Sequence, residues 1–295
     1  MKQKLYHFHE IFEETFNDKS EEHLSRIGAE TPKGKYREYL GNDSLIRLVK
    51  KDPELHSKFI EYNWVDKNFN LLPLYYKIDD AGFRIFDNSK EESIASLGCS
   101  YTYGMGVHLE QTWTYKLSRL LNKPAWNFGI PGASQDLNYE TLLRYLPEKN
   151  ISDLFWLIPE SSRDNLIVYD KKVGKYIRVR IASNCEDRKL NHIKNYTAQD
   201  YFKDCRISNT KLFSDTQKNI DAVENICRRY NIRLHKVLNP LFISQSILDK
   251  LLDNDNNFFK VQNYEISYDM THLGVPFHDT VADYFYKKFN QSVGI

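Results

Sequence analysis

The sequence has little of what marks several large protein classes. Its four cysteines form no CxxC pair and no metal-finger spacing, so neither a disulfide framework nor a structural metal is expected. Its charges nearly cancel, with 41 Lys and Arg against 40 Asp and Glu, which argues against a dedicated nucleic-acid binder. No run approaches the roughly 20 apolar residues that span a bilayer, and the N-terminus lacks the apolar core of a signal peptide. We expect a cytoplasmic protein with neither a membrane nor a nucleic-acid partner.

What is present fits a folded globular chain. Its 295 residues are 41% hydrophobic and 14% aromatic, enough for one large or two ordinary domains. Residues 1–90 are charged and carry short amphipathic stretches at 11–16, 44–50 and 53–62, the last opening on Pro53, which suits the first turn of a helix. We predict a mostly helical N-terminal extension there, packed on the main domain and without a strand series of its own.

Residues 91–295 alternate between short apolar runs and segments with helical spacing. The predicted strands are Ile94–Leu97, Ala125–Phe128, Leu154–Ile158 and Ile232–Leu238. The predicted helices are 113–121, 137–146, 212–230, 247–252 and 276–289. Strands that alternate with helices favour a parallel sheet covered by helices on both faces, which is an α/β fold. Residues 165–209 interrupt the alternation, and we predict an insertion that begins with a hairpin.

A serine follows the first predicted strand at once. The apolar run ends at Gly98, and Ser100 comes two residues later. Ligands of parallel α/β folds bind outside the carboxyl ends of the strands, so this hydroxyl is well placed. Near the end of the chain, Asp269 and His272 are the only Asp and His spaced by three. Serine, histidine and aspartate together are the side chains of a hydrolase that attacks acyl groups with serine.

A glycine-rich turn follows the second predicted strand, at Asn127–Ser134. Glycine lets the backbone approach a ligand closely and present an N–H to it. A developing oxyanion requires such donors. The same glycines also suit an ordinary strand-to-helix turn, and one turn can serve both purposes.

Three segments together resemble the sequence blocks of the SGNH (GDSL-type) hydrolases. Gly98–Thr102, Asn127–Gly132 and Asp269–His272 look like the first, second and last blocks, in the correct order, and the resemblance covers about residues 80–290. It implies a flavodoxin-like three-layer α/β/α sandwich and the hydrolysis or transfer of an ester-linked acyl group, with no cofactor and no metal. The implied substrate is a small-molecule or glycan ester.

The resemblance also assigns roles to residues. It makes Ser100 the nucleophile, His272 the base and Asp269 the group that orients the histidine. The backbone N–H groups of Ser100 and Gly132 become oxyanion donors. The stretch Asp79–Arg84 looks like a lead-in of some members, to which the resemblance attaches no role.

The block after the third strand departs from the family pattern. The family places Gly-x-Asn-Asp after the third strand, where this chain has Pro159–Asp164. Ser161 falls closest to the asparagine position, and its hydroxyl is a candidate oxyanion donor. Arg163 and Glu160 are candidates for substrate contact, with Arg163 suited to an anionic group. The missing carboxamide favours one alternative, a non-catalytic carbohydrate-binding protein that keeps the fold; the 20 tyrosines and four tryptophans suit such a role. An acyltransferase of the same fold is the other alternative.

Other nucleophiles and mechanisms have less support. Cys99 replaces the usual aspartate before the serine, and a thiolate attacks acyl groups well. Neighbouring strand residues point to opposite faces, however, so only one of Cys99 and Ser100 can face the site, and we expect Cys99 to be a buried thiol. An α/β-hydrolase needs Gly-x-Ser-x-Gly, but residue 102 is threonine. His7 and His9 lack the carboxylates and spacing of a metal site.

Overall fold

The structure is a computed structural model that describes residues 36–39, 43–79, 83–84, 92–160, 163–170, 175–181, 209–239, 267–269 and 272–294. The stretch at 11–16, the helix expected at 247–252, and Ser161 lie outside the described residues. The main elements of the extension and the sheet are β1 (Tyr36–Tyr39), α3 (Asp43–Val49), α4 (Pro53–Glu61), β2 (Leu74–Lys77), β3 (Ser93–Gly98), α5 (Ser100–Tyr103), α6 (Trp113–Leu121), β4 (Ala125–Gly129), α7 (Gln135–Tyr145), β5 (Ile151–Ile158), α9 (Asn209–Arg229), β8 (Arg233–Leu238) and α11 (Val275–Val293). Two short 3₁₀ helices, η1 (Leu109–Gln111) and η2 (Leu146–Glu148), complete the loops.

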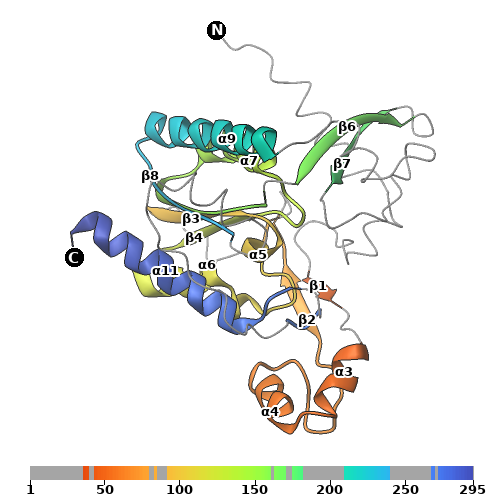
Figure 1. Ribbon diagram of the computed structural model, residues 1–295. Helices are drawn as coiled ribbons and strands as arrows, with labels where there is room; N and C mark the ends of the chain where they lie inside the picture. Colours follow the sequence, from red (N-terminus) through yellow and green to blue (C-terminus); the bar gives the residue numbers. More distant parts are fainter. Residues whose placement is uncertain are drawn as a thin grey trace.

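A four-stranded parallel sheet is the centre of the fold (Figure 1), in the order β4-β3-β5-β8. Leu97 of β3 lies opposite Phe128 of β4 and Trp156 of β5. Numbered along the chain, the order is 2-1-3-4, which is that of the first four strands of a flavodoxin-like sheet. All four predicted strands are present, so the parallel-sheet prediction is confirmed.

Helices cover both faces of this sheet. Figure 1 shows α7 and α9 on one side and α6 with α11 on the other. The strands β3 and β5 are buried almost throughout, which explains their continuous apolar runs. Ser134 accepts the N–H of Leu137 at 3.4 Å and caps α7. The α/β class and three-layer arrangement are therefore confirmed. None of the described helices is both long enough and apolar enough to cross a bilayer.

In the described part of the N-terminal extension, the predicted stretches at 44–50 and 53–62 form the helices α3 and α4. Asp52 accepts the N–H groups of Glu54 and Leu55 and caps α4, with Pro53 in the first turn. The expectation that this part has no strand series of its own was wrong, because β1 and β2 form a two-stranded antiparallel sheet. Side chains of β2 alternate between buried and exposed, but its partner lies some 35 residues earlier in the chain, which local patterns do not reveal. The division of the chain near residue 90 stays a prediction.

A second hydrophobic core joins this extension to the main domain. Trp64, Leu74 and Tyr76 of the extension are buried together with Tyr103 and Tyr268 of the α/β domain. The extension therefore packs on the loop after α5 and on the segment before α11.

The predicted hairpin is present as β6 (Asp164–Asp170) and β7 (Lys175–Ile181), which pair antiparallel. Leu166 lies opposite Val179 in this pair. In Figure 1 the hairpin extends to one side of the layers, beyond α7 and α9. The first strand begins earlier than expected, so Asp164 belongs to the hairpin and not to a loop after the third strand of the sheet.

Candidate active site

Ser100 begins the one-turn helix α5, directly after the central strand β3. The turn is tight, because a Cβ on Gly98 would lie 2.8 Å from the carbonyl oxygen of Leu157 in β5 and would overlap the Thr102 side chain. Only glycine fits where two backbones approach this closely. The serine is thus held rigidly at the carboxyl end of the sheet, and it is 5% exposed. Cys99, one residue earlier, is a fully buried free thiol.

The Asn127 side chain ties the second strand of the sheet to α5. Its Nδ2 donates to the carbonyl oxygen of Thr102 at 2.8 Å, and its Oδ1 accepts the N–H of Gly129 at 2.8 Å. The N–H of Ile130 donates to the carbonyl oxygen of Gly98 at 3.2 Å. A buried carboxamide with both ends engaged fixes its surroundings. The turn after β4 is therefore fixed against the serine-bearing turn.

Gly132 lies in that turn. Its φ is 74°, and the N–H of Ala133 donates to the carbonyl oxygen of Ile130 at 2.9 Å. With Pro131 second and glycine third, this is the composition of a type II turn, which requires positive φ at its third residue. Among the described residues, the N–H groups of Gly132 and Ser100 have no protein acceptor.

Asp269 and His272 are joined directly in the turn before α11. The Asp269 Oδ2 lies 2.6 Å from His272 Nδ1, and its Oδ1 accepts the backbone N–H of the same histidine at 3.0 Å. The Ser267 hydroxyl donates to Oδ1 at 2.5 Å, and the Ser267 N–H donates to the carbonyl oxygen of His272 at 2.9 Å. The contact between Asp269 Oδ2 and His272 Nδ1 assigns the ring proton to Nδ1, so Nε2 is the nitrogen with the basic lone pair. The Asp269 side chain is 2% exposed and that of His272 is 21% exposed, so the pair opens toward solvent at the imidazole.

This turn lies against the segment that carries the serine. The ring of Tyr101, next to Ser100, meets the His272 imidazole edge-on, with centroids 5.2 Å apart. The N–H of Tyr268 donates to the carbonyl oxygen of Gly106, in the loop after α5, at 3.0 Å. Within the described residues no hydrogen bond joins Ser100 Oγ to His272. Such contacts are often long without substrate and tighten when it binds.

The end of the third strand supplies a buried ion pair. Glu160 and Arg163 have 6% and 9% exposed side chains, with 3.7 Å between the carboxylate Oε2 and the guanidinium Nε. The Arg163 N–H also donates to the carbonyl oxygen of Glu160 at 3.2 Å, and Gln135 Nε2 donates to that of Pro159 at 3.0 Å. Ser161, the candidate donor between these residues, lies outside the described part of the chain.

Tyr101 marks the point where these segments converge. Burial is the main cause that raises the pKa of its phenol, and the charges of Cys99, Asp269 and Glu160 raise it further. Arg163 acts in the opposite direction. Coulomb effects weaken with distance and screening, so the charges that follow β5 and those of the turn before α11 act most strongly on nearby groups. The structure thus brings Tyr101 against His272, and the charges of Glu160 and Arg163 act on the same phenol.

Some contributors to this site were not foreseen. The sequence predicted the strand end at Gly98 but not the helix α5, nor the contacts that Asn127 and Tyr101 make. Asn127 lies in a segment singled out for its glycines, and a polar residue inside a buried strand was the available signal. Among the described residues, no three His, Cys, Asp or Glu side chains gather as metal ligands would.

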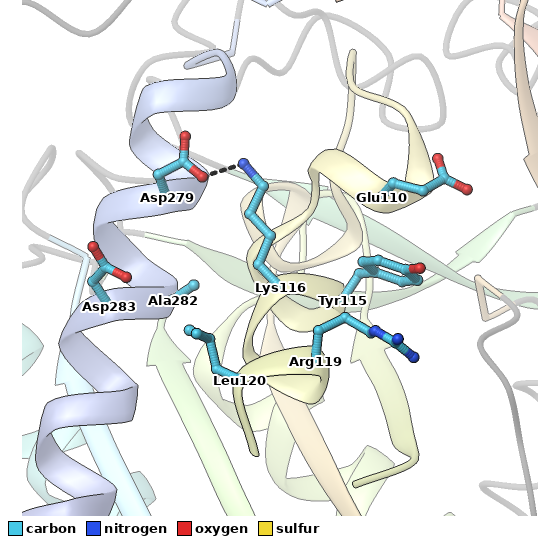
Figure 2. Close-up of a pocket in the computed structure, with 8 residues that line it drawn as sticks. All are labelled: Glu110, Tyr115, Lys116, Arg119, Leu120, Asp279, Ala282 and Asp283. Atoms are coloured by element: carbon cyan, nitrogen blue, oxygen red, sulfur yellow. Dashed lines mark hydrogen bonds and ion pairs between the residues drawn. The ribbon is translucent and has the colours of Figure 1, made fainter. Parts of the chain in front are cut away.

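A groove of about 430 Å³ lies elsewhere, between α6 and α11 (Figure 2). It contains none of the predicted site residues. Lys116 on α6 forms an ion pair with Asp279 on α11 across it, while Tyr115, Arg119 and Asp283 line its open sides. The groove is shallow and open to solvent, with opposite charges on its two walls.

No family model matches the chain, and no curated protein matches its sequence. Solved structures with a similar fold are GDSL lipolytic proteins and carbohydrate esterases. The psychrotrophic esterase EstA from Pseudoalteromonas sp. is 11% identical, with 70% of this chain and 100% of that chain covered and a TM-score of 0.39. A family two carbohydrate esterase from Clostridium thermocellum, in complex with cellohexaose, is 14% identical, with 69% and 65% covered and a TM-score of 0.40. A G-D-S-L family lipolytic protein from Desulfitobacterium hafniense is 11% identical, with 67% and 99% covered and a TM-score of 0.32. We therefore infer activity from the residues of this chain alone.

Proposed function

We propose that this chain is an SGNH-type esterase that cleaves an ester-linked acyl group through a covalent acyl-enzyme. Ser100 is the nucleophile, His272 the general base and Asp269 the residue that orients it. The substrate is a small-molecule or glycan ester. No step requires a metal or a cofactor.

The observation that carries the proposal is the double hold of Asp269 on His272. One carboxylate oxygen bonds Nδ1 at 2.6 Å and the other bonds the backbone N–H at 3.0 Å, so both the tautomer and the ring position are set. The edge contact from Tyr101 places that ring beside the residue next to Ser100. An imidazole oriented in this way, next to a serine at a strand end, is the arrangement that activates a hydroxyl.

The proposed reaction has two halves. Ser100 Oγ attacks the acyl carbonyl carbon while His272 Nε2 takes its proton. The oxyanion accepts hydrogen bonds from the N–H groups of Ser100 and Gly132, with the Ser161 hydroxyl as a third donor. The intermediate collapses, and the leaving alcohol receives the proton from His272. Water, activated by the same nitrogen, then releases the acid and restores the serine.

Glu160 and Arg163 are proposed to form the wall that contacts the substrate. Their side chains are almost fully buried, and their charges act on the phenol of Tyr101, which follows Ser100; both observations support a place for them near the nucleophile. The Glu160 carboxylate offsets the arginine charge, which favours an uncharged acyl or sugar group next to the pair. We therefore revise the earlier expectation that Arg163 anchors an anionic group.

Labelling with a serine-directed organophosphonate tests the proposal. The expected result is one adduct on Ser100, located by peptide mass spectrometry, together with hydrolysis of short-chain p-nitrophenyl esters. Ser100→Ala should abolish both, whereas Cys99→Ala should retain both, because the Cys99 thiol is buried. An unlabelled wild-type protein that hydrolyses no ester would contradict the proposal and support the non-catalytic binding protein. Addition of acceptor alcohols would identify an acyltransferase by ester products that outnumber free acid.

A further inference from the structure

Arg84 is a buried cation that the proposed reaction does not use. Its side chain is 2% exposed, and burial lowers the pKa of the guanidinium. Among the described residues, no carboxylate forms an ion pair with it. Its hydrogen-bond partners are main-chain carbonyl oxygens: Nη1 donates to Tyr103 at 3.3 Å and Gly104 at 2.8 Å, and Nη2 donates to Val107 at 2.9 Å. A buried arginine used in this way holds a backbone conformation, because each lost bond would leave a buried acceptor unsatisfied.

Two of these carbonyls, those of Tyr103 and Gly104, belong to the end of the helix that Ser100 begins, and that of Val107 belongs to the loop after it. The last carbonyls of a helix have no partner inside it, and a cation at that end is favourable. The helix α5 has a single turn and ends at Gly104, whose φ is 80°. A Cβ on Gly104 would lie 2.8 Å from Arg84 Nη1, so the glycine is what lets the guanidinium reach the backbone. Arg84 therefore fixes the C-terminal end of the turn whose N-terminal end carries the nucleophile.

The same loop also contacts the Asp269–His272 turn. Gly106 accepts the N–H of Tyr268 through its carbonyl oxygen at 3.0 Å, and a Cβ on Gly106 would lie 3.1 Å from Asp269 Cγ. Its own N–H donates to the Tyr76 hydroxyl at 2.7 Å. A displacement of this loop would thus move both the serine segment and the carboxylate that orients His272.

Other residues of the N-terminal extension contact both Arg84 and the segment that precedes His272. The Arg84 guanidinium carbon lies 4.3 Å from the centroid of the Tyr76 ring, a cation–π contact. The Tyr268 hydroxyl donates to the carbonyl oxygen of Leu72 at 2.8 Å, and the Trp64 ring meets that of Tyr268 edge-on. The extension therefore contacts both the loop after α5 and the turn before α11, through Tyr76, Leu72 and Trp64.

We propose that Arg84 is a positioning residue, through which the N-terminal extension sets the geometry between Ser100 and the Asp269–His272 pair. This role rests on the proposed esterase function. It gives the Asp79–Arg84 lead-in a physical purpose, and it makes the extension part of the catalytic apparatus.

Two substitutions test the role at different strengths. Arg84→Met keeps an unbranched apolar stem but removes every donor, whereas Arg84→Lys keeps the charge but replaces the planar fork by a single ammonium. Asp153→Asn is the control variant, because it weakens a buried ion-pair network near the amino ends of the strands. It changes neither the loop after α5 nor the turn before α11. Tyr76→Phe is a second, milder probe, which deletes the acceptor of the Gly106 N–H and keeps the ring. It remains informative where Arg84→Met does not fold.

The readouts are ester kinetics, the rate of Ser100 phosphonylation and amide hydrogen exchange. We expect Arg84→Met to lower kcat about 10- to 100-fold with little change in KM, since a displacement of about 1 Å costs that much. Arg84→Lys should recover part of the loss, and Asp153→Asn, at similar stability, should show none. Exchange should rise selectively at residues 100–107 and 267–269. A folded Arg84→Met protein with wild-type kcat and phosphonylation rate would overturn the role. If Arg84→Met does not fold, the same result for Tyr76→Phe would overturn it.

The two proposals fail in different ways. A wild-type protein that is neither phosphonylated nor active on esters would overturn the esterase function. Amide exchange would then decide the structural part by itself: selective loss of protection in the two segments supports the Arg84 hold, and uniform loss or no loss contradicts it.

Discussion

Two Asp–His pairs lie at opposite ends of the strands of the same sheet. Asp153 and His235 sit near the amino ends of β5 and β8, with Asp153 Oδ1 3.1 Å from His235 Nε2. Asp269 and His272 sit with the serine beyond the carboxyl ends, joined through Nδ1 at 2.6 Å. The residue types are the same, and both carboxylates are buried. What differs is the third partner of each pair.

In the pair near the amino ends of the strands, the third partner is an arginine. Arg233 donates to Asp153 at 2.8 Å and 3.1 Å, and the His235 ring stacks on Phe155 with centroids 4.6 Å apart. Burial raises the pKa of Asp153, but hydrogen bonds from His235, Arg233 and Ser152 outweigh that effect and lower it. A carboxylate so saturated by donors ties strands together. An Asp–His pair by itself therefore says little about catalysis, and its place in the sheet and its remaining neighbours decide its role.

The largest expected effect separates the pairs by activity. His272→Asn should lower kcat about 10⁴-fold or more, because it removes the base, and leave thermal stability close to wild type. His235→Gln should do the reverse, lowering stability and leaving kcat unchanged. Steady-state ester hydrolysis and thermal unfolding measure both. Equal losses of kcat in the two variants would contradict the comparison.

The next effect separates the pairs by stability. Asp153→Asn should lower the free energy of unfolding by about 2–3 kcal/mol, because it leaves His235 and Arg233 without their anion; the cost is moderated by the 46% exposure of Arg233. Asp269→Asn should cost less, since the backbone and serine bonds of Asp269 are made at a short local turn. Urea denaturation of both proteins measures the difference. A smaller loss for Asp153→Asn than for Asp269→Asn would reverse our assignment of the structural pair.

A third histidine, which has no carboxylate partner within the described part of the chain, sharpens the comparison. His278 on α11 is buried and accepts the N–H of Trp113 on Nδ1 at 3.2 Å. Burial lowers its pKa to about 3, and the charges of Lys116, Arg84 and His272 act in the same direction. The unfolded chain binds a proton on this residue below about pH 6.5, whereas the folded chain does not. Its contribution to stability is complete above that pH and is lost progressively as the pH falls toward the folded pKa.

This linkage predicts a slope of about 1.4 kcal/mol per pH unit from His278 between about pH 6 and pH 4. His278→Asn keeps an acceptor near Nδ1 without titrating, so it should remove that share of the slope. Asp153 contributes in the same direction, but only in stronger acid, because its lowered pKa preserves its charge to lower pH. Urea denaturation at several pH values gives both curves, and parallel curves for the two proteins would refute the assignment.

The smallest effect concerns the ring beside each histidine. Tyr101→Leu removes the edge contact with His272, which is worth about 0.5–1.5 kcal/mol, and should lower kcat/KM about two- to tenfold. Tyr101→Phe keeps the ring and should retain most of the activity. Phe155→Leu is the matched change beside His235, and it should affect stability alone. A loss of activity in a fully folded Phe155→Leu protein would show that the two ends of the sheet are coupled.

Local sequence patterns predicted much of this architecture. The apolar runs of β3, β4, β5 and β8 and the helical spacing of α6, α7, α9 and α11 are visible without any contact between them. The hydrogen bonds of Asp269 to His272 also follow from residues three apart in one turn. The pairing of β1 with β2 was missed, because it joins residues that no periodicity links.

The sequence by itself determined the class of fold, the strands and helices from which it is built, and the side chains available for chemistry. Strand and helix periods are local properties of the chain. Only the tertiary structure decided that Arg84 and Tyr76 hold the loop after the serine, and that Tyr101 meets His272 across some 170 residues of chain. Those contacts depend on how separate segments pack in three dimensions. Burial and close approach, not sequence spacing, select which residues meet.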